Sequence, residues 1–417
     1  MKILHINQSD IEGGAAIAGY RLHQGLLAQG IGSKLLVGHA KTKSNFVSTI
    51  SRKYRLENQL YRLTKPLGLN YLNLLGAFDI PNHPFYQEAD ILNFHNLHTG
   101  HFNYLVIPSL TKSKPAIFTL HDMWSFTGHC AYSFDCDRWQ TGCGSCPYPD
   151  SYPAIATDNT HLEWKLKNWL YQCSNMTIVA PSNWLAEQAR RSMLRRFPIH
   201  HIPNGIDVAA YKPLDPEQCR AVLGIPANKQ VLLFGAESLT NTRKGGDLLF
   251  KALKNLPQSL KTEIVLLTFG DSGEEMAEAI RIPTLNLGYV SSDRLKSMAY
   301  SAADLFVFPT RADNLPLVLQ ESMACGTPMV SFKVGGVPDL VRPGVTGYLA
   351  APEDADDFCS GIVQLLEDKT LRHQMSHNCR EIALKEYPLD LQAQRYLEVY
   401  QQALAKTSTK NLSKTAL

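Results

Sequence analysis

Two carboxylates, Asp313 and Glu321, stand one short helical stretch apart in the second half of the sequence. Asp313 is expected in a loop, and Glu321 within a helix predicted over residues 316–324. They would then lie roughly 10 Å apart, which is too far for a shared proton or a paired general acid and base. The spacing favours two acids that bind hydroxyl groups at opposite ends of one long ligand, such as a nucleotide-sugar. A helix-dipole role is the alternative for Asp313, but it does not explain Glu321 in an apolar stretch.

Two basic residues, Arg243 and Lys244, stand directly before a pair of glycines in the same half of the sequence. They come after a strand predicted over residues 231–234, which Gly235 directly follows. A helix that opens on glycine presents backbone N–H groups to an anion, and neighbouring cations strengthen the attraction. The pattern favours a pyrophosphate site, with a solvated basic turn as the alternative.

Two strand ends in the first half of the sequence also carry residue types that bind ligands. Gly13 and Gly14 open a helix predicted over residues 15–28, so their backbone N–H groups could approach a ligand closely. His121 directly follows a strand predicted over residues 116–120. Ligands of open parallel sheets bind beyond the carboxyl ends of the strands, which favours function at these positions. An ordinary strand-to-helix turn and a structural histidine are the alternatives.

Four of the nine cysteines fall within one short segment, at Cys130, Cys136, Cys143 and Cys146. The closing Cys-x2-Cys pair has a spacing that is common among zinc ligands, and four thiolates can enclose a tetrahedral zinc ion. A closed site of this kind is structural, so we expect zinc to stiffen the loop that follows His121. Reduced, unliganded thiols and an iron–sulfur cluster are the alternatives.

Short apolar segments alternate with helical patterns along most of the sequence, which is typical of parallel β-sheets covered by helices on both faces. The segment Pro-Asn-Gly-Ile-Asp at residues 203–207 interrupts the alternation and indicates a domain boundary. We predict a first α/β domain over residues 1–203, a second over 204–385 and a returning helix over 386–405. The predicted strands span residues 3–7, 34–37, 91–94, 116–120, 177–180, 231–234, 263–268, 305–308 and 329–332.

Composition excludes several classes of protein. The 417 residues are too many for one ordinary core, and 44% hydrophobic with 19% charged residues is normal for a globular protein. A net charge of +3 gives no indication of nucleic-acid binding. No segment reaches the roughly 20 apolar residues of a spanning helix, and residues 1–7 are typical of a buried strand rather than a signal peptide. We therefore expect a cytoplasmic protein.

The segment over residues 52–65 combines arginines and lysines with tyrosines and leucines. This composition could contact the inner face of the membrane or a lipid-linked phosphate. A solvated helix face is the alternative. Peripheral membrane contact is therefore an expectation added to the cytoplasmic location.

Three segments taken together resemble a known family. Residues 313–328, 201–207 and 335–339 are similar to the matching motifs of the retaining glycosyltransferases of family 4. The resemblance implies the GT-B fold, in which two Rossmann-like domains face each other across a cleft. It extends from the first strand to about residue 400. The turn at residues 13–16, together with the cysteine segment, resembles a subgroup that acts in bacterial cell-surface polysaccharide synthesis of the colanic-acid type.

The resemblance implies a role for each matching residue. Glu321 matches the acid that holds the donor ribose, and Asp313 matches the acid that contacts hydroxyls of the transferred sugar. Lys244 matches the lysine that neutralises the diphosphate, and His121 matches the histidine that touches the donor sugar. The remaining donor-binding residues are expected to be Arg243, Gly13, Gly14, Asn314, Leu315 and Gly235.

Three positions depart from the family pattern. Asp313 stands where the family has glutamate, which shortens the reach of the first acid by one methylene. Ala236 stands where an arginine is frequent, so Arg243 is the candidate for the missing charge. Pro316 stands where glycine often presents an N–H group to the donor, and proline has no N–H group.

These observations predict transfer of a sugar from a UDP- or GDP-sugar to a carbohydrate or lipid-linked carbohydrate, with retained configuration. No catalytic metal is expected. A sugar phosphorylase or epimerase on the same fold is one alternative. The other is a degenerate scaffold that binds nucleotide-sugars without turnover, which Ala236 and Pro316 motivate.

Overall fold

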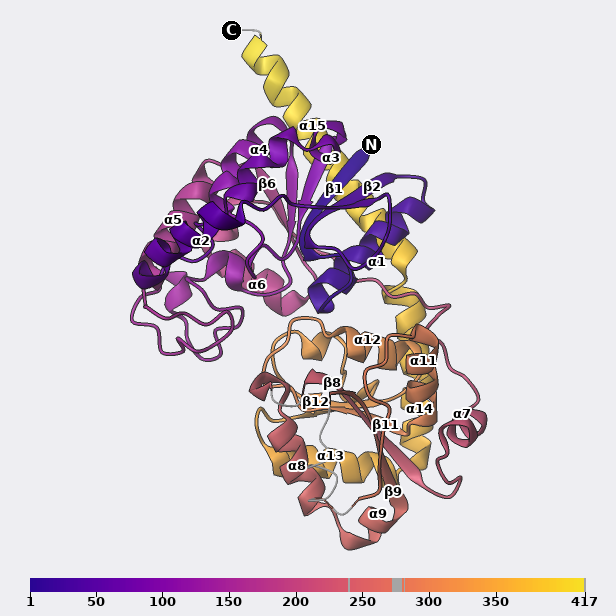
Figure 1. Ribbon diagram of the computed structural model, residues 1–417. Coiled ribbons are helices and arrows are strands. Elements are labelled where there is room, and N and C mark those ends of the chain that lie inside the picture. The colour runs from indigo at the N-terminus through magenta and orange to yellow at the C-terminus, as the bar shows by residue number, and fades with distance from the viewer. Residues whose placement is uncertain (239–240, 272–279, 281, 416–417) are drawn as a thin grey trace. The chain divides into compact units, whose positions relative to one another are not determined.

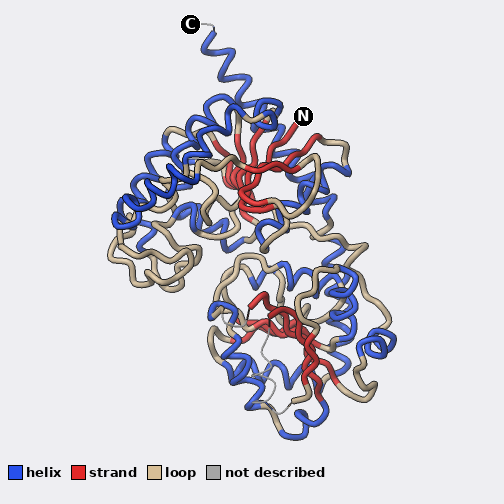
Figure 2. Tube along the Cα trace, in the orientation of Figure 1, coloured by secondary structure: helices blue, strands red, loops and turns tan. Residues whose placement is uncertain are grey.

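The chain forms two compact α/β units, each built around its own parallel β-sheet (Figure 1). The computed structural model describes residues 1–238, 241–271, 280 and 282–415. Unit 1 comprises Met1–Gly205 and Leu389–Leu417, and unit 2 comprises Ile206–Pro388. Within each unit, helices pack around the sheet, as the tube view shows (Figure 2). The predicted class, two Rossmann-like parallel-sheet domains, is confirmed.

Unit 1 contains a seven-stranded sheet in the order β3-β2-β1-β4-β5-β6-β7, and all neighbouring strands are parallel. The strand order changes direction beside β1, which has β2 on one side and β4 on the other. Open α/β sheets bind ligands at such a switch point. The strands are β1 (Lys2–Ser9), β2 (Gly32–His39), β3 (Val47–Thr49), β4 (Ile91–Phe94), β5 (Ala116–Thr119), β6 (Met176–Ala180) and β7 (Ile199–His201).

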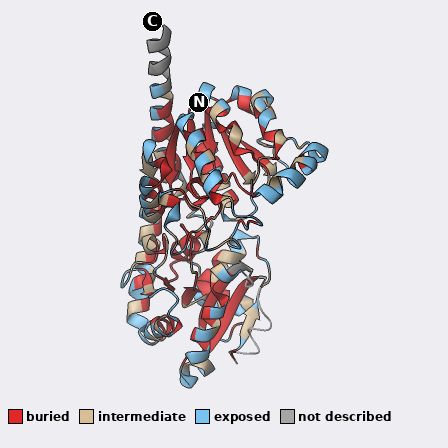
Figure 3. Ribbon diagram, turned by 90° about the vertical axis from the view of Figure 1, so that its left-hand side faces the viewer, coloured by how far each residue is buried: buried red, intermediate tan, exposed pale blue. Residues whose placement is uncertain are grey.

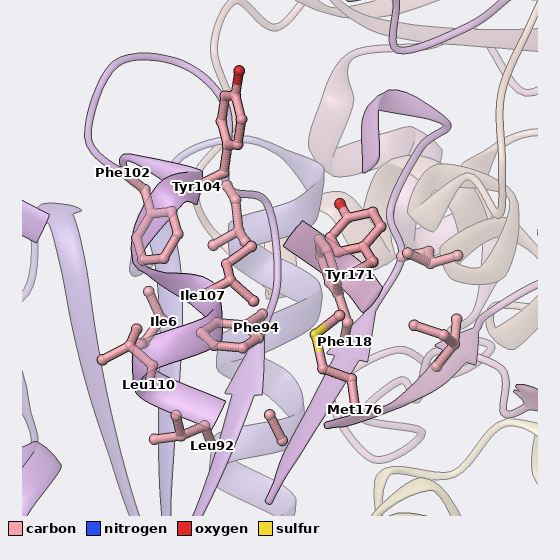
Figure 4. Close-up of a cluster of buried hydrophobic side chains, with 14 of the residues drawn as sticks. Ile6, Leu92, Phe94, Phe102, Tyr104, Ile107, Leu110, Phe118, Tyr171 and Met176 are labelled. Carbon is pink, nitrogen blue, oxygen red and sulfur yellow. The ribbon is translucent and has the colours of Figure 1, made fainter. Parts of the chain in front are cut away.

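The largest core of unit 1 lies between its sheet and the covering helices. Figure 4 shows Phe94 of β4 and Phe118 of β5 in this core, together with Ile107 and Tyr171 from two helices. The two phenylalanine rings meet edge to face, with centroids 6.0 Å apart. The helices of the first segment are α1 (Gly14–Ala28), α2 (Tyr54–Thr64), α3 (Pro84–Glu88), α4 (Ile107–Ser113), α5 (Thr160–Gln172) and α6 (Asn183–Arg191).

The helix α15 (Leu389–Thr415) belongs to unit 1 although it follows unit 2 in the sequence. It runs beside α1, and Figure 1 shows it in yellow. Two buried tyrosine hydroxyls join it to the sheet. Asn93 Nδ2 donates to Tyr400 Oη at 2.8 Å, and Thr119 Oγ1 lies 3.0 Å from Tyr396 Oη. This helix therefore covers part of the sheet of unit 1.

Unit 2 contains a six-stranded sheet in the order β10-β9-β8-β11-β12-β13, again with parallel neighbours. Its switch point lies beside β8, between β9 and β11. The strands are β8 (Gln230–Ser238), β9 (Ile264–Asp271), β10 (Thr284–Asn286), β11 (Leu305–Phe308), β12 (Met329–Phe332) and β13 (Gly347–Ala350). The helices are α7 (Pro216–Leu223), α8 (Gly246–Asn255), α9 (Gln258–Glu263), α11 (Asp293–Ala302), α12 (Leu317–Ala324), α13 (Ala355–Glu367) and α14 (Lys369–Glu386).

The burial of both sheets follows from their sequences. β4, β5, β6, β11 and β12 are buried at every residue, because helices cover both faces of a parallel sheet. Figure 3 shows the central strands as buried and the outward faces of the helices as exposed. Among the described residues, no helix combines the length and the apolar character that crossing a bilayer requires.

Candidate functional site

An ion-paired group of side chains joins the loop between β11 and α12 to the segment that precedes α8. We call it the Asp313 cluster, and it consists of Arg243, Lys244 and Asp313. Asp313 Oδ2 accepts from Lys244 Nζ at 2.7 Å and from Arg243 Nη1 at 3.0 Å. Arg243 Nη1 also donates to the Ala312 carbonyl at 2.6 Å. The three residues that the sequence assigned to a diphosphate and a sugar are thus in direct contact.

The Asp313 carboxylate keeps its charge although the residue is only 9% exposed. Burial acts to raise the pKa of Asp313, because a carboxylate loses solvation in the protein interior. The charges and hydrogen bonds of Lys244 and Arg243 outweigh burial, so the pKa lies below its ordinary value. With two cations and one anion, the cluster carries a net charge of +1, which suits an anionic ligand.

The two loops of the cluster are joined backbone to backbone. The Arg311 N–H donates to the Arg243 carbonyl at 2.8 Å. Gly245 has a φ of +70°, and a Cβ there would lie 1.9 Å from the Pro309 carbonyl oxygen. Only glycine permits this approach. The glycine that follows Lys244 therefore serves the packing of the loops, in addition to opening the helix α8.

A second glycine turn fixes Asp313 from the opposite side. Gly335 has a φ of +49°, and a Cβ there would lie 2.0 Å from the Asp313 carbonyl oxygen. The next N–H group, that of Gly336, donates to the same oxygen at 3.1 Å. The Asn314 N–H donates to Asp313 Oδ1 at 3.0 Å. The carboxylate is therefore held by Arg243, Lys244 and the Asn314 N–H, while the turn at Gly335 and Gly336 holds the backbone carbonyl of Asp313.

Glu321 lies within α12 and is only 3% exposed. The Tyr300 hydroxyl donates to Glu321 Oε2 at 3.4 Å. Burial first, and then the charge of Glu321, raise the pKa of Tyr300 well above its ordinary value, so the hydroxyl remains a donor. A buried carboxylate is costly unless it is hydrogen-bonded, so Glu321 depends on such partners.

Two of the predicted donor-binding residues have evident packing roles. Leu315 belongs to an apolar core of unit 2 and is 5% exposed. Gly235 lies against the ring of Phe269, where a Cβ would come within 2.2 Å of a ring carbon. Asn314 is buried beside Asp313. Contact of these residues with a donor stays a prediction.

In unit 1, the loop between β1 and α1 is held by Asp10, which the sequence analysis did not single out. Burial acts to raise the pKa of Asp10, and the hydrogen bonds it accepts lower it below the ordinary value. Its donors are the Ser9 hydroxyl at 3.2 Å, the Ile11 N–H at 3.0 Å, the Lys41 N–H at 2.9 Å, the Thr42 N–H at 2.8 Å and the Thr42 hydroxyl at 2.6 Å. Gly13, with a φ of +86°, and Gly14 then begin α1.

Three histidines from different strands form a hydrogen-bonded row, which we call the histidine row. His5 lies within β1, His95 directly follows β4, and His121 follows β5. His5 Nδ1 is 2.9 Å from His95 Nε2, and His95 Nδ1 is 3.0 Å from His121 Nε2. Burial lowers the pKa of His5 and His95 well below the ordinary value and that of His121 to about 4. All three rings are therefore neutral at pH 7.

A second histidine contact fixes the loop after β5. His98 Nε2 is 2.8 Å from Asp122 Oδ2, and the Trp124 N–H donates to Asp122 Oδ1 at 2.9 Å. The pKa of Asp122 is lowered, because the His98 ring and the Trp124 N–H outweigh the opposing effect of burial. The neighbour of His121 is thus anchored to the loop that follows β4.

The prediction of structural zinc is wrong. Within the part of the chain that the structure describes, no group of three or more His, Cys, Asp or Glu side chains could hold a metal ion. Cys143 Sγ accepts instead from the Gly128 N–H at 3.2 Å, and Cys146 Sγ lies 3.2 Å from His129 Nε2. Burial raises the pKa of Cys130 to about 12 and that of Cys143 to about 11, which favours thiols over thiolates. All four predicted ligands are free cysteines: Cys130, Cys136, Cys143 and Cys146.

His5 and His95, which join His121 in one row, were not predicted as site residues. A signal was available, because each of them lies within or directly after a predicted strand. Their contact could not be predicted from the sequence, since 90 residues separate them along the chain. Tyr300, the partner of Glu321, was also not predicted, although only 21 residues separate the two.

Two Rossmann-like units with acids, cations and histidines around their switch points define the GT-B class of glycosyltransferase. Two family models match the chain. The model "Glycosyltransferase Family 4" matches residues 12–210, and "Glycosyl transferases group 1" matches residues 215–382. The chain therefore belongs to the glycosyltransferases that combine these two domains.

Individual relatives agree with this assignment. A putative colanic acid biosynthesis glycosyl transferase, WcaC of Escherichia coli K12, is 29% identical over 354 residues, covering 79% of this chain and 83% of the relative. A lipopolysaccharide 1,2-N-acetylglucosaminetransferase of Salmonella typhimurium is 29% identical over 237 residues, covering 53% and 61%. The crystal structure of Anabaena HepE with UDP-glucose has a TM-score of 0.68 at 19% identity, covers 96% of this chain and 100% of its own, and shows a shared fold.

Proposed function

We propose that the protein transfers a sugar from a nucleotide-sugar to a carbohydrate or lipid-linked carbohydrate in surface polysaccharide biosynthesis. The Asp313 cluster is the observation that carries the proposal. It places two cations against a buried carboxylate at the start of α12, within the region matched by the group 1 model. Because the related fold of HepE was solved with UDP-glucose, a UDP-sugar is the first donor to test, and a GDP-sugar the second.

In this proposal, Lys244 and Arg243 bind the diphosphate of the donor. An ammonium group has three N–H donors and a guanidinium has five, so each can hold Asp313 and a phosphate oxygen together. The N-terminus of α8 follows directly and adds backbone N–H groups that favour negative charge. Asp313 then limits the movement of both cations, which preorganises them for a charge that grows as the donor bond breaks.

The two acids divide the rest of the donor between them. Asp313 binds hydroxyls of the transferred sugar, and Glu321 binds the ribose. In unit 1, His121 supplies a hydrogen bond to the sugar. None of these residues is proposed as a nucleophile, because the acids act by orienting the donor rather than by forming a covalent intermediate.

Retention of configuration follows from a front-face route. The bond between the anomeric carbon and the diphosphate oxygen breaks, and its electron pair goes to the diphosphate. The acceptor hydroxyl oxygen forms the new bond on the same face and gives its proton to that departing oxygen. Lys244 and Arg243 stabilise the developing negative charge.

The relatives and the surface of α2 support an acceptor at the inner face of the membrane. WcaC is named for colanic acid biosynthesis, and the Salmonella relative acts on lipopolysaccharide. Helix α2 buries only Glu57, whose Oε2 accepts from Arg52 Nε at 2.6 Å. It leaves Arg55, Arg62 and Leu63 exposed to bind anionic headgroups and acyl chains.

The decisive experiment measures binding and hydrolysis of UDP-, GDP- and ADP-sugars by the full chain and by Glu321→Gln. We expect one nucleotide-sugar to bind. We expect the variant to weaken it by about tenfold or more, since a hydrogen bond to a charged group contributes about 1.5–3 kcal/mol.

Asp304→Asn is the matched control. Asp304 precedes β11 at the opposite end from Asp313, and its Oδ2 accepts from Arg220 Nη2 at 2.8 Å. This variant should lose stability and keep its donor affinity. The proposal fails if no nucleotide-sugar binds, or if Glu321→Gln binds as tightly as the parent. Binding without transfer to any acceptor would favour the scaffold alternative.

A further inference from the structure

The histidine row has a constraint that a single histidine lacks. Both of its hydrogen bonds must be donated in the same direction along the row. A neutral imidazole has one N–H donor and one bare nitrogen acceptor. His95 uses both ring nitrogens, so it donates to one neighbour and accepts from the other. Protons therefore point either from His5 toward His121 or from His121 toward His5.

Neighbouring rings of the row contact each other at their edges, as hydrogen bonds between ring nitrogens require. The centroids of His5 and His95 are 5.2 Å apart, and those of His95 and His121 are 5.3 Å apart, with interplanar angles of 29° and 25°. The bonded nitrogens are much closer than the centroids, at 2.9 and 3.0 Å. The rings therefore form two in-line hydrogen bonds and are not stacked face on face.

The inner end of the row determines its direction. His5 Nε2 is buried, and it has no hydrogen-bond partner among the described residues. If protons pointed toward His5, this atom would carry a buried N–H group without an acceptor. Orphaned buried N–H groups are rare and costly, and bare acceptors are tolerated more often. The proton of His5 therefore lies on Nδ1, and His5 donates to His95.

We propose that His95 is a positioning residue that fixes the tautomer of His121. His95 Nδ1–H donates to His121 Nε2, so His121 carries its own proton on Nδ1 and donates it to an oxygen of the bound sugar. This inference rests on the proposed function, in which His121 binds the transferred sugar. Its ligand class is a hydroxyl or ring oxygen of a hexose, met by a neutral donor.

The packing around the row prevents the rings from turning. His5 and His95 are 0% and 2% exposed, and His121 is only partly buried. Gly19 of α1 packs on the row, and a Cβ there would lie 3.4 Å from two atoms of the His95 ring. The charged group beside the outer end is Asp122, which is bound to His98. The row thus connects a buried interior to the partly buried ring of His121.

Nitrogen NMR of the full chain, labelled with ¹⁵N in the histidine rings, tests the proposal directly. Protonated and bare ring nitrogens have different shifts, and substitution of each histidine in turn assigns the signals. We expect His121 to be protonated on Nδ1 and bare on Nε2. Protonation of His121 on Nε2 would overturn the proposal, whether or not the variants below fold.

Two variants separate positioning from space filling. His95→Leu removes the donor to His121 Nε2 without adding a larger ring beside Gly19. We expect it to release the His121 tautomer and to lower kcat/KM about tenfold, which corresponds to one hydrogen bond to the sugar. An unchanged His121 signal in this variant would also overturn the proposal.

His23→Leu is the matched control. His23 is buried beside His5, with ring centroids 6.3 Å apart, but its Nδ1 is bonded to Ser33 Oγ at 2.7 Å and lies outside the row. It should leave the His121 signals in place, and a shift as large as that of His95→Leu would contradict a specific role. If no variant or parent transfers sugar, the proposed function fails, and the NMR signals still decide the tautomer.

Discussion

The Asp313 cluster of unit 2 and the histidine row of unit 1 occupy corresponding places and have opposite electrostatics. Each lies by the switch point of its parallel sheet, at β8 and β11 in unit 2 and at β1, β4 and β5 in unit 1. The cluster remains ionised, because two cations compensate the buried acid. The row remains neutral, because each of its inner rings is paired with another imidazole. Buried polar groups are thus stabilised in two different ways, by an ion pair in unit 2 and by hydrogen bonds between neutral rings in unit 1.

The comparison teaches which part of a ligand each unit suits. A net positive cluster attracts a diphosphate, whereas a neutral imidazole can hydrogen-bond a sugar without strongly attracting an anion. The predictions below test this contrast.

The largest effect is expected for Lys244→Ala, which would reduce the net charge of the cluster from +1 to zero. We expect kcat/KM to fall about 100-fold or more, the usual cost of removing one preorganised donor to a developing negative charge. Steady-state transfer assays measure the loss. Lys229→Ala is the control, because Lys229 precedes β8 at its opposite end and donates to the Thr262 carbonyl. Equal losses of kcat/KM in both variants would contradict the contrast between the Asp313 cluster and the histidine row.

Gly245→Ala should cost about 2 kcal/mol of stability, since it forces a side chain into positive φ and against the Pro309 carbonyl. Denaturant unfolding measures this loss. The two loops of the Asp313 cluster would separate, so donor affinity should fall with stability. A variant of full stability would show that the cluster tolerates movement of these loops.

The two units should respond to acid at different pH. In the row, the unfolded chain binds protons below the ordinary histidine pKa of 6.5, and folded His121 does so only near 4. Stability from the row is therefore present above pH 6.5 and lost as the pH falls toward 4. The pKa of Asp313 is lowered from 3.8, so its contribution is lost only below that value. Hydrogen exchange of each unit from pH 7 to pH 3.5 should show unit 1 opening first, and simultaneous opening would contradict the contrast.

The smallest effect is expected for Gly14→Ala in unit 1. A Cβ at Gly14 would meet nothing within 4 Å, and its φ is not in the left-handed region. Stability should change by less than about 0.5 kcal/mol. A loss of donor affinity at unchanged stability would support the sequence prediction that a ligand approaches this turn.

The sequence predicted the fold well because burial in parallel sheets leaves a strong local signal. All nine predicted strands are present, and the start of α12 is found one residue after Pro316. The short strands β3, β7, β10 and β13 were not predicted. Three or four residues at a sheet edge do not form a distinctive apolar run.

The site was predicted in part, because contacts between residues far apart in the sequence could not be predicted. The acids and cations of unit 2 were recognised one by one, but their direct pairing joins residues 69 and 70 positions apart. The cysteine spacing misled, because spacing is necessary for a metal site and does not fix the directions of the sulfurs. Gly128 and His129, which contact two of those sulfurs, directly precede the cysteine segment, and nothing in the sequence indicated these contacts.

The return of α15 to unit 1 has a consequence for the order in which the chain can be completed during translation. Unit 2 is one continuous stretch whose ends meet at the bridge between Ile206 and Pro388, so it can finish folding as soon as residue 388 leaves the ribosome. Unit 1 is begun first and finished last, because the tyrosines that bond Asn93 and Thr119 follow them by 307 and 277 residues. Until α15 is made, the apolar residues of unit 1 that pack against it, among them Ile3, Leu22 and Ile117, lack this cover.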